Sequence, residues 1–150
     1  MTGCTVKELC AAVGGTLLQQ SGAVVTEVST DSRSIPAGAL FVPLVGERID
    51  GHDYLDAALE RGAAGCLTAR KPASLLNDKF YIQVSDTLEA LKALAAWYRD
   101  RFAIPMVQVT GSAGKTTTKD MIAAVLSQRV STLKTQANFN NAIGTPLTLL

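Results

Sequence analysis

The sequence predicts an α/β protein in which a small mixed α/β domain is followed by the start of a parallel-sheet domain with a phosphate loop. Short helical and strand-like runs alternate through residues 1–84. After residue 85, a glycine-rich loop lies between an expected strand and an expected helix, which is the order of a βαβ unit. The 150-residue chain is 47% hydrophobic and 18% charged, a composition typical of globular domains. We therefore expect one domain over residues 1–84 and a second over residues 85–150.

Residues 1–84 are predicted to form two helices and several short strands. Residues 6–13 have the apolar spacing of an amphipathic helix that ends at two glycines, and residues 54–61 have helical spacing before Gly62. Apolar and β-branched runs bounded by turn residues predict strands. These runs are residues 16–18, 24–29, 39–44, 65–68 and 80–84. Their order shows no strong rhythm of parallel-sheet units.

The second part begins with a long predicted helix at residues 86–102, capped by Ser85 or Asp86. After it we expect, in order, a buried strand at residues 106–110, a helix at 114–129 and a second strand at 130–133. The residues that lead up to Leu150 are apolar and helix-like. Because a nucleotide-binding sheet contains more strands than these, we expect the chain to be the front part of a longer enzyme and to be inactive alone.

The composition excludes several classes of protein. A net charge of +1, from 14 basic and 13 acidic residues, does not provide the basic surface that nucleic-acid binding requires. The longest apolar run, residues 39–45, contains Pro43 and is too short to span a bilayer, and no secretory signal is apparent. The widely spaced Cys4, Cys10 and Cys66 fit neither a disulfide framework nor a zinc site. We therefore expect a cytoplasmic protein with reduced cysteines, no nucleic-acid partner and no membrane insertion.

The strongest functional signal is the glycine-rich segment at residues 109–118. Gly111 and Gly114 allow the backbone to bend so that consecutive N–H groups point at one anion, and the following helix adds the positive end of its dipole. Lys115 is placed to reach the outer phosphates, and the Thr116 hydroxyl to bind magnesium. The residues predicted to bind the nucleotide here are Gly111, Ser112, Ala113, Gly114, Lys115, Thr116 and Thr117. Val109 stands where the general phosphate-loop pattern has glycine, which argues against a generic ATPase; a glycine-rich turn with an incidental lysine is the simpler alternative.

Three segments carry a resemblance to a known family. The Thr-Gly-Ser-x-Gly-Lys-Thr-Thr order of residues 110–117 resembles the shorter phosphate loop of the Mur ligases and the folylpolyglutamate synthetases. Residues 135–150, with three asparagines ahead of a Gly-x-Pro, resemble the segment of the Mur ligases that add D-alanyl-D-alanine, although Ala137 replaces their usual glycine. Residues 29–54 look like the segment that holds the UDP part of the substrate in these ligases. The three segments together span most of the chain in the family's order.

The resemblance implies an ATP-dependent ligase of peptidoglycan precursor synthesis. Its substrates would be UDP-N-acetylmuramoyl-tripeptide and D-alanyl-D-alanine, joined through an acyl phosphate, with ATP and Mg²⁺ as cofactors and a monomer as the expected state. Residues 1–84 would form the UDP-substrate domain, and residues 85–150 the start of the central ATP-binding domain. The implied site residues are Lys115 for catalysis, Thr116 for magnesium, Asn138 and Asn141 for the nucleotide, and Ser32, Arg33 and His52 for the UDP-linked substrate.

Several alternatives remain open at this point. Arg33 can pair with a neighbouring carboxylate, His52 can be a helix-start residue, and the asparagines can cap a helix. The whole chain can belong to another Mur-type amino-acid ligase. It can also be a non-catalytic fragment that binds a nucleotide or the UDP-linked precursor.

Overall fold

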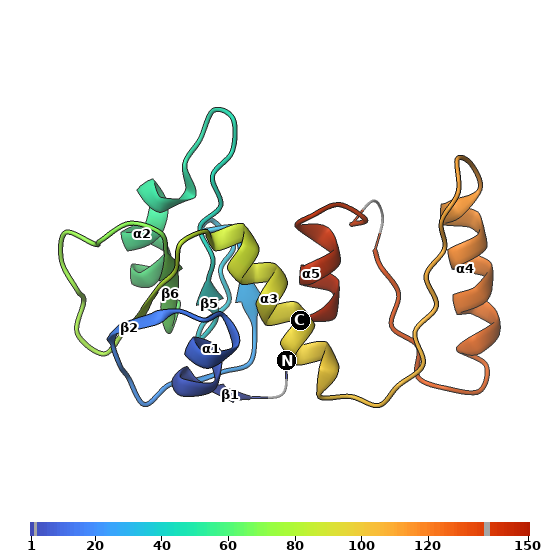
Figure 1. The fold of residues 1–150 in the computed structure, drawn as a ribbon, viewed down its shortest axis with the longest axis horizontal. Coiled ribbons are helices and arrows are strands. Elements are labelled where there is room, and N and C mark those ends of the chain that lie inside the picture. Colours follow the sequence, from blue (N-terminus) through green and yellow to red (C-terminus); the bar gives the residue numbers. More distant parts are fainter. Residues whose placement is uncertain (2, 137–138) are drawn as a thin grey trace.

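The computed structural model describes residues 1, 3–136 and 139–150, and it confirms the predicted α/β class (Figure 1). The strands are β1 (Cys4–Thr5), β2 (Thr16–Gln19), β3 (Val24–Val25), β4 (Val28–Ser29), β5 (Leu40–Phe41), β6 (Gly65–Thr68) and β7 (Phe80–Gln83). The helices are α1 (Val6–Ala12), the 3₁₀ helix η1 (Gly51–Tyr54), α2 (Leu55–Glu60), α3 (Thr87–Asp100), α4 (Lys115–Leu126) and α5 (Gly144–Leu149). Helices and strands of the first part thus lie close to their predicted positions.

Within the described residues, five strands form one sheet in the order β2-β7-β6-β5-β4. Neighbours from β4 to β7 pair in parallel, and β2 adds an antiparallel edge strand to β7. The expectation that this part lacks a parallel-sheet rhythm was therefore wrong. The reason lies in the connections: in the described residues no helix joins β4 to β5 or β6 to β7, and only β5 and β6 are joined through η1 and α2, so strands and helices do not alternate along the sequence.

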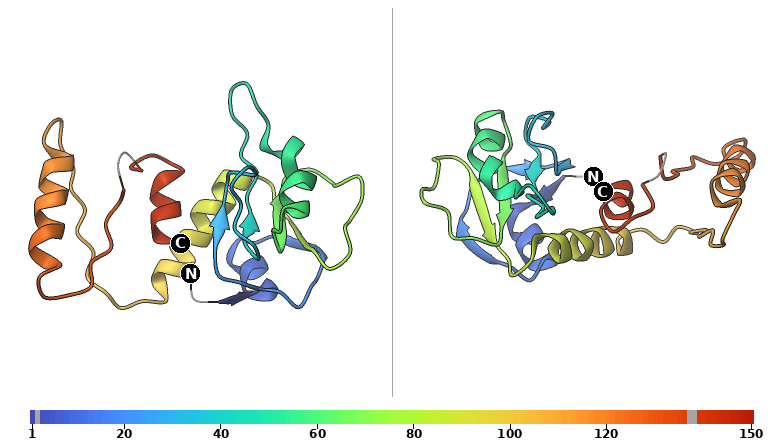
Figure 2. Two further views of the ribbon diagram at one scale, coloured as in Figure 1. Left: turned by 180° about the vertical axis from the view of Figure 1, so that it is seen from behind. Right: turned by 90° about the horizontal axis from the view of Figure 1, so that it is seen from above.

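Both faces of this sheet are covered, because neighbouring residues on each strand point to opposite sides. Leu40 and Leu67 contribute to a core with α1 and α3, whereas Phe41 and Cys66 contribute to a second core with α2. The right-hand view of Figure 2 shows α2 on one side of the sheet and α3 on the other. A parallel sheet with helices on both faces is the arrangement in which strands become almost wholly apolar.

Helix α3 packs on the core formed by the elements that precede it. Its first turn is capped by Asp86, whose carboxylate accepts the N–H groups of Leu88 and Glu89 at 2.8 and 2.9 Å, as the sequence predicted. Leu91 and Leu94 are fully buried in the core that α1 and the sheet share. The domain division near residue 85 stays a prediction. Helix α3, which follows residue 85, packs on the core of the residues before it.

The two strands predicted beside the glycine-rich loop are not formed, so these predictions were wrong. Residues 106–110 and 130–133 have no strand pairing, and large apolar side chains there are exposed, for example Met106 at 61% and Leu133 at 74%. A strand is stabilised only by a neighbour that accepts and donates along its backbone, and no segment within residues 3–136 or 139–150 lies there to do so. Helix α4 is formed as predicted but stands away from the sheet in both views of Figure 2.

The three cysteines are free thiols in the described residues. Cys4, Cys10 and Cys66 form no disulfide there, and burial raises the pKa of the Cys66 thiol. No helix over the described part of the chain combines the length and the apolar character that crossing a bilayer requires.

The place of α3 in the first core can be tested by truncating Leu94. The change Leu94→Ala removes a fully buried side chain and should lower the free energy of unfolding by about 2–5 kcal/mol in urea titrations. The matched change Leu75→Ala alters a side chain that is 41% exposed and should cost about 0.5 kcal/mol or less. Equal, small effects of both changes would mean that α3 does not belong to this core.

Candidate functional site

The parallel sheet brings the predicted substrate residues to one edge. Strands β4, β5 and β6 run in the same direction, so the segments that follow them emerge on the same side of the sheet. Residues 30–34 follow β4, residues 42–52 follow β5, and residues 69–71 follow β6. We call this side of the sheet, where the carboxyl ends of β4, β5 and β6 meet, the carboxyl edge. In open α/β sheets, ligands bind at this position because loops and unpaired backbone groups converge there.

The turn after β4 is fixed by short hydrogen bonds. The Ser29 hydroxyl accepts the Asp31 N–H at 3.2 Å, and Asp31 Oδ1 accepts the Arg33 N–H at 2.9 Å. The Arg33 guanidinium makes two further bonds of 2.9 Å to the same carboxylate, yet its side chain is 84% exposed. Arg33 therefore pairs with a neighbouring carboxylate, as the alternative interpretation held, and still presents charge to solvent.

Ser32 lies in the same turn but is nearly buried. Its carbonyl accepts a bond of 2.9 Å from Arg61 Nη1, at the end of α2. This contact joins the turn after β4 to the helix that covers one face of the sheet. It therefore fixes the backbone on which Arg33 is carried.

His52 is held inside the protein through both ring nitrogens. Nε2 accepts the Ala69 N–H at 3.0 Å and so carries no proton; Nδ1 therefore carries the proton and donates to Asp50 Oδ1 at 2.7 Å. The ring is 4% exposed. These bonds leave no ring nitrogen for a ligand, so His52 joins the loop after β5 to the loop after β6.

Arg70 is a carboxyl-edge residue that the sequence analysis missed. It lies two residues after the predicted strand at residues 65–68, but its proximity to Asp50 becomes visible only once the strands are known to be parallel. Its guanidinium pairs with Asp50 through Nη2 and with Asp53 through Nη1, the latter at 3.5 Å, and the side chain is 60% exposed. The bond from the His52 N–H holds the pKa of Asp50 below its ordinary range, so this carboxylate is charged at neutral pH.

The glycine-rich loop forms the second candidate site. Gly114 precedes α4 with φ of 75° and ψ of −3°, a left-handed conformation that favours glycine. The first helical bond joins the Thr118 N–H to the Gly114 carbonyl at 2.9 Å, so the amides of residues 115–117 have no acceptor within the helix. The loop is exposed, and Lys115 Nζ bends back over it to donate to the Gly111 carbonyl.

This loop has the features that a polyphosphate needs. The amides of residues 115–117 lie at the N-terminus of α4, where the positive end of the helix dipole attracts anions, and the Lys115 ammonium group lies over the same exposed loop. Thr116 is exposed in the first turn of α4, where its hydroxyl can join phosphate oxygens around a magnesium ion. Within the described residues, no cluster of three or more His, Cys, Asp or Glu side chains offers a separate metal site.

The predicted asparagines are not brought to this loop. Asn138 lies outside the described residues. Asn141 lies in the turn before α5, and its Oδ1 accepts the N–H groups of Ile143 and Gly144 at 3.1 and 2.7 Å. The start of α5 and the start of α4 lie apart in both views of Figure 2, so the role of Asn141 in nucleotide binding stays a prediction.

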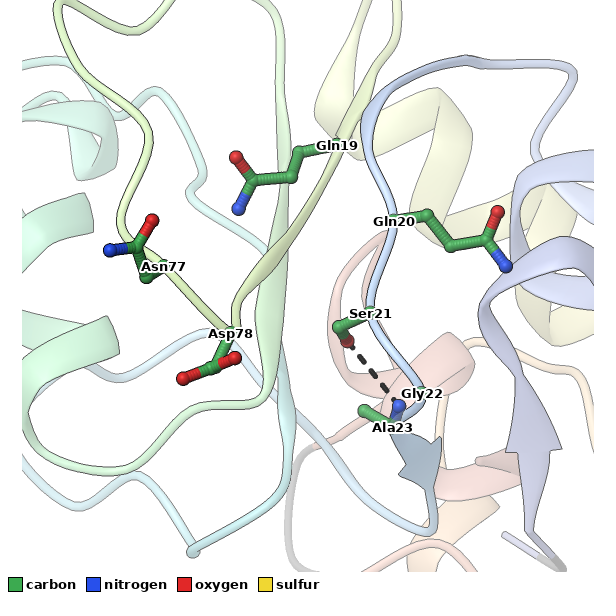
Figure 3. A pocket seen from close by; sticks show the side chains of 7 residues that line it. All are labelled: Gln19, Gln20, Ser21, Gly22, Ala23, Asn77 and Asp78. Carbon is green, nitrogen blue, oxygen red and sulfur yellow. Dashed lines mark hydrogen bonds between the residues drawn. The ribbon is translucent and has the colours of Figure 1, made fainter.

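A polar hollow of about 690 Å³ lies elsewhere on the first part of the chain. Figure 3 shows its lining, with Gln19 and Asp78 on two facing segments and the Ser21 hydroxyl accepting the Ala23 N–H at 3.3 Å. Gln19 pairs with Tyr81, near the start of β7, and therefore lies at the edge of the sheet opposite to the carboxyl edge. None of the predicted site residues lines this hollow.

Two family models match the chain. Residues 24–99 match the model described as Mur ligase family, catalytic domain, and residues 109–150 match the Mur ligase middle domain. The carboxyl edge lies in the first match and the glycine-rich loop in the second.

Several curated relatives carry the same name. The chain is 48% identical over 126 residues to the UDP-N-acetylmuramoyl-tripeptide–D-alanyl-D-alanine ligase of Synechocystis sp., which covers 84% of this chain and 28% of that protein. It is 45% identical over 148 residues to the ligase of the same name from Bacillus subtilis, covering 97% and 32%. The chain thus spans about a third of the length of the curated relatives it matches.

Solved structures agree with these relatives. The D-alanyl-D-alanyl ligase of Acinetobacter baumannii superimposes with a TM-score of 0.91 at 32% identity, covering 99% of this chain and 33% of that one. A MurF ligase from Thermotoga maritima, solved in complex with ADP, gives a TM-score of 0.74 at 34% identity and covers 83% and 29%.

The ion pair at the carboxyl edge can be tested by titration. The hydrogen bonds that Arg33 donates to the Asp31 carboxylate lower the pKa of Asp31 from 3.8 to about 2. The pKa of Asp31 in the folded chain lies below its ordinary value, so the ion pair stabilises the fold fully above pH 3.8. This contribution is lost as the pH falls through about 2. Carboxyl NMR titration should therefore show Asp31 titrating near 2 and moving toward its ordinary pKa in Arg33→Gln. An ordinary pKa in the unmodified chain would contradict the pairing.

Proposed function

The chain belongs to the Mur ligase family, and we propose that it acts within an ATP-dependent ligase that joins D-alanyl-D-alanine to UDP-N-acetylmuramoyl-tripeptide. The observation that carries this proposal is the open loop ahead of α4, with Gly114 in a left-handed conformation and the amides of residues 115–117 free of helical acceptors. The names of the relatives support the substrates, and the ADP bound to the Thermotoga maritima ligase supports the nucleotide. Such a reaction would serve peptidoglycan precursor synthesis.

The proposed reaction has two steps. A terminal carboxylate oxygen of the tripeptide attacks the γ-phosphorus of ATP, which releases ADP and forms an acyl phosphate. The amine of D-alanyl-D-alanine then attacks the acyl carbon, and phosphate leaves with the electron pair of the broken C–O bond. Activation is necessary because an unmodified carboxylate has no leaving group comparable to phosphate.

In this proposal the residues of the glycine-rich loop act by placing positive charge. Lys115 exchanges its bond to the Gly111 carbonyl for a bond to the outer phosphates, and the loop amides bind the remaining oxygens. Thr116 would hold a magnesium ion through its hydroxyl, and this ion would supply further neutralisation of the transferring group. Stabilising charge that develops in the transition state, with donors that need little reorientation, is the principal contribution that a protein makes to phosphoryl transfer.

The carboxyl edge is proposed to hold the UDP end of the substrate. Ser32 and Arg33 lie in the turn after β4, where the Arg33 guanidinium is exposed to solvent while it pairs with Asp31. His52 contributes by joining two loops of this edge, since both of its ring nitrogens are bonded within the protein. We further propose that a cytoplasmic monomer carries out the reaction, and that α3 belongs with the UDP-binding part.

A second candidate is a binding module without turnover. Its basis is that the chain spans about a third of the length of its relatives and that apolar side chains on α4, such as Met121 at 64% and Val125 at 71%, stay exposed within the described residues. Nucleotide binding with no phosphate release under any condition is the result that this candidate predicts.

The two candidates are separated by phosphate release. Residues 1–150, extended at the carboxyl end to the full length of the relatives, would be given ATP, magnesium and UDP-N-acetylmuramoyl-tripeptide with either D-alanyl-D-alanine or single amino acids. We expect release that depends on D-alanyl-D-alanine, and none from residues 1–150 alone. Release with a different amine would assign the chain to another Mur-type ligase, and no release with any amine would favour the binding module.

The role of Lys115 gives a sharper prediction. Lys115→Ala should weaken ATP binding by the chain and lower phosphate release by the extended protein at least about 100-fold. The reason is that the substitution removes the positive charge that neutralises the transferring phosphoryl group. Lys7→Ala removes the same charge from an exposed position on α1 and should leave both quantities unchanged. Full activity of Lys115→Ala would remove this residue from the proposed mechanism.

A further inference from the structure

Arg70 has its backbone fixed by a buried hydroxyl. The side chain of Thr68, which ends β6 and is 1% exposed, accepts the Arg70 N–H at 3.1 Å and donates to the Arg70 carbonyl at 2.6 Å. The position of Arg70 at the carboxyl edge is thus determined by the last residue of the strand.

The guanidinium of Arg70 is fixed by a second set of bonds. Nη2 pairs with Asp50 Oδ2, while Asp50 Oδ1 accepts both the His52 N–H, at 2.9 Å, and His52 Nδ1, at 2.7 Å. His52 Nε2 in turn accepts the N–H of Ala69, the residue before Arg70. These bonds form a closed ring through Ala69, His52, Asp50 and Arg70, which we call the Arg70 ring.

The inner members of the ring are shielded, whereas the arginine is not. His52 is 4% exposed and the side chain of Asp50 16%, but that of Arg70 is 60% exposed. An exposed arginine normally samples many rotamers, and holding one in place with a shielded carboxylate and imidazole does little for stability. Such an arrangement does serve binding, because a guanidinium that is already ordered loses less freedom when a ligand arrives.

We propose that Arg70 binds the phosphates of a nucleoside diphosphate at the carboxyl edge, and that Asp50 and His52 are positioning residues that hold it there. The inference rests on the proposed UDP-linked substrate and names a binding residue for it. Two of the five N–H donors of Arg70 are engaged by Asp50 and Asp53, and the planar guanidinium matches phosphate oxygens in a bidentate geometry. Arg33 is exposed on the same edge, separated from the β6 loop by β5, so two guanidinium groups flank this position.

Asp53 competes with a phosphate for the same guanidinium. Its carboxylate is 67% exposed and lies 3.5 Å from Arg70 Nη1, a weaker contact than that of Asp50. A phosphate that binds Arg70 Nη1 in place of Asp53 would lie beside the negatively charged Asp53 carboxylate, which would repel it. Removing the Asp53 charge should therefore strengthen binding, whereas removing Arg70 should weaken it.

The test is UDP and uridine binding by calorimetry to the chain of residues 1–150. Arg70→Gln should weaken UDP binding about tenfold or more and leave uridine binding unchanged, because uridine has no phosphate. Arg129→Gln, the matched control, removes the same charge from the exposed segment after α4 and should change neither. Asp53→Asn should strengthen UDP binding about twofold or more.

The positioning role is tested by a double-mutant cycle. His52→Ala should weaken UDP binding, but His52→Ala combined with Arg70→Gln should bind UDP no more weakly than Arg70→Gln alone, because His52 acts through Arg70. Circular dichroism and thermal unfolding verify that each variant is folded; if His52→Ala unfolds, Arg70→Gln and Asp53→Asn decide the question.

Each outcome has one meaning. Unchanged UDP binding in Arg70→Gln, together with a loss in Arg33→Gln, would overturn this inference and leave the proposed function standing. Additive losses in the double variant would overturn the positioning role of His52. An unmodified chain that binds neither UDP nor uridine would contradict the proposed function and the inference together.

Discussion

The parallel alignment of β4, β5, β6 and β7 determines which side chains of this chain can act together. Because the strands share one direction, three segments that are far apart in sequence emerge at one edge and place Arg33, His52 and Arg70 there. The alignment is stable because alternating residues bury both faces of the sheet under α1 and α3 on one side and α2 on the other. A change of direction or register in β5 would move His52 away from Ala69 and open the Arg70 ring.

The second proposed phosphate-binding region depends on local backbone geometry instead of the sheet. Gly114 and the first turn of α4 create a positive position without help from any strand within the described residues. The part of the chain that carries it returns to the first core through α5, where Ile143 and Leu147 pack against the buried cluster that contains α3.

The sequence predicted well the features that short stretches of chain determine. The cap at Asp86, the helix that follows the glycine loop and the strand at residues 65–68 all depend on near neighbours. It failed where a distant partner decides the outcome. The strand order could not be predicted because no helix joins β4 to β5 or β6 to β7 in the described residues. Residues 106–110 have the composition of a strand but no strand beside them. Arg70 could be recognised as a site residue only from its pairing with Asp50, which is distant in sequence.

The proposed function requires two separate phosphate-binding positions in this chain. Amide hydrogen exchange, followed residue by residue with UDP or with ATP and magnesium, tests it most directly, because a bound anion slows exchange of the amides that contact it. We predict that UDP protects residues 30–34 and 69–71, that ATP protects residues 111–117, and that neither ligand protects the other set. Protection of the same amides by both ligands, or of neither set, would contradict the presence of two separate phosphate-binding positions.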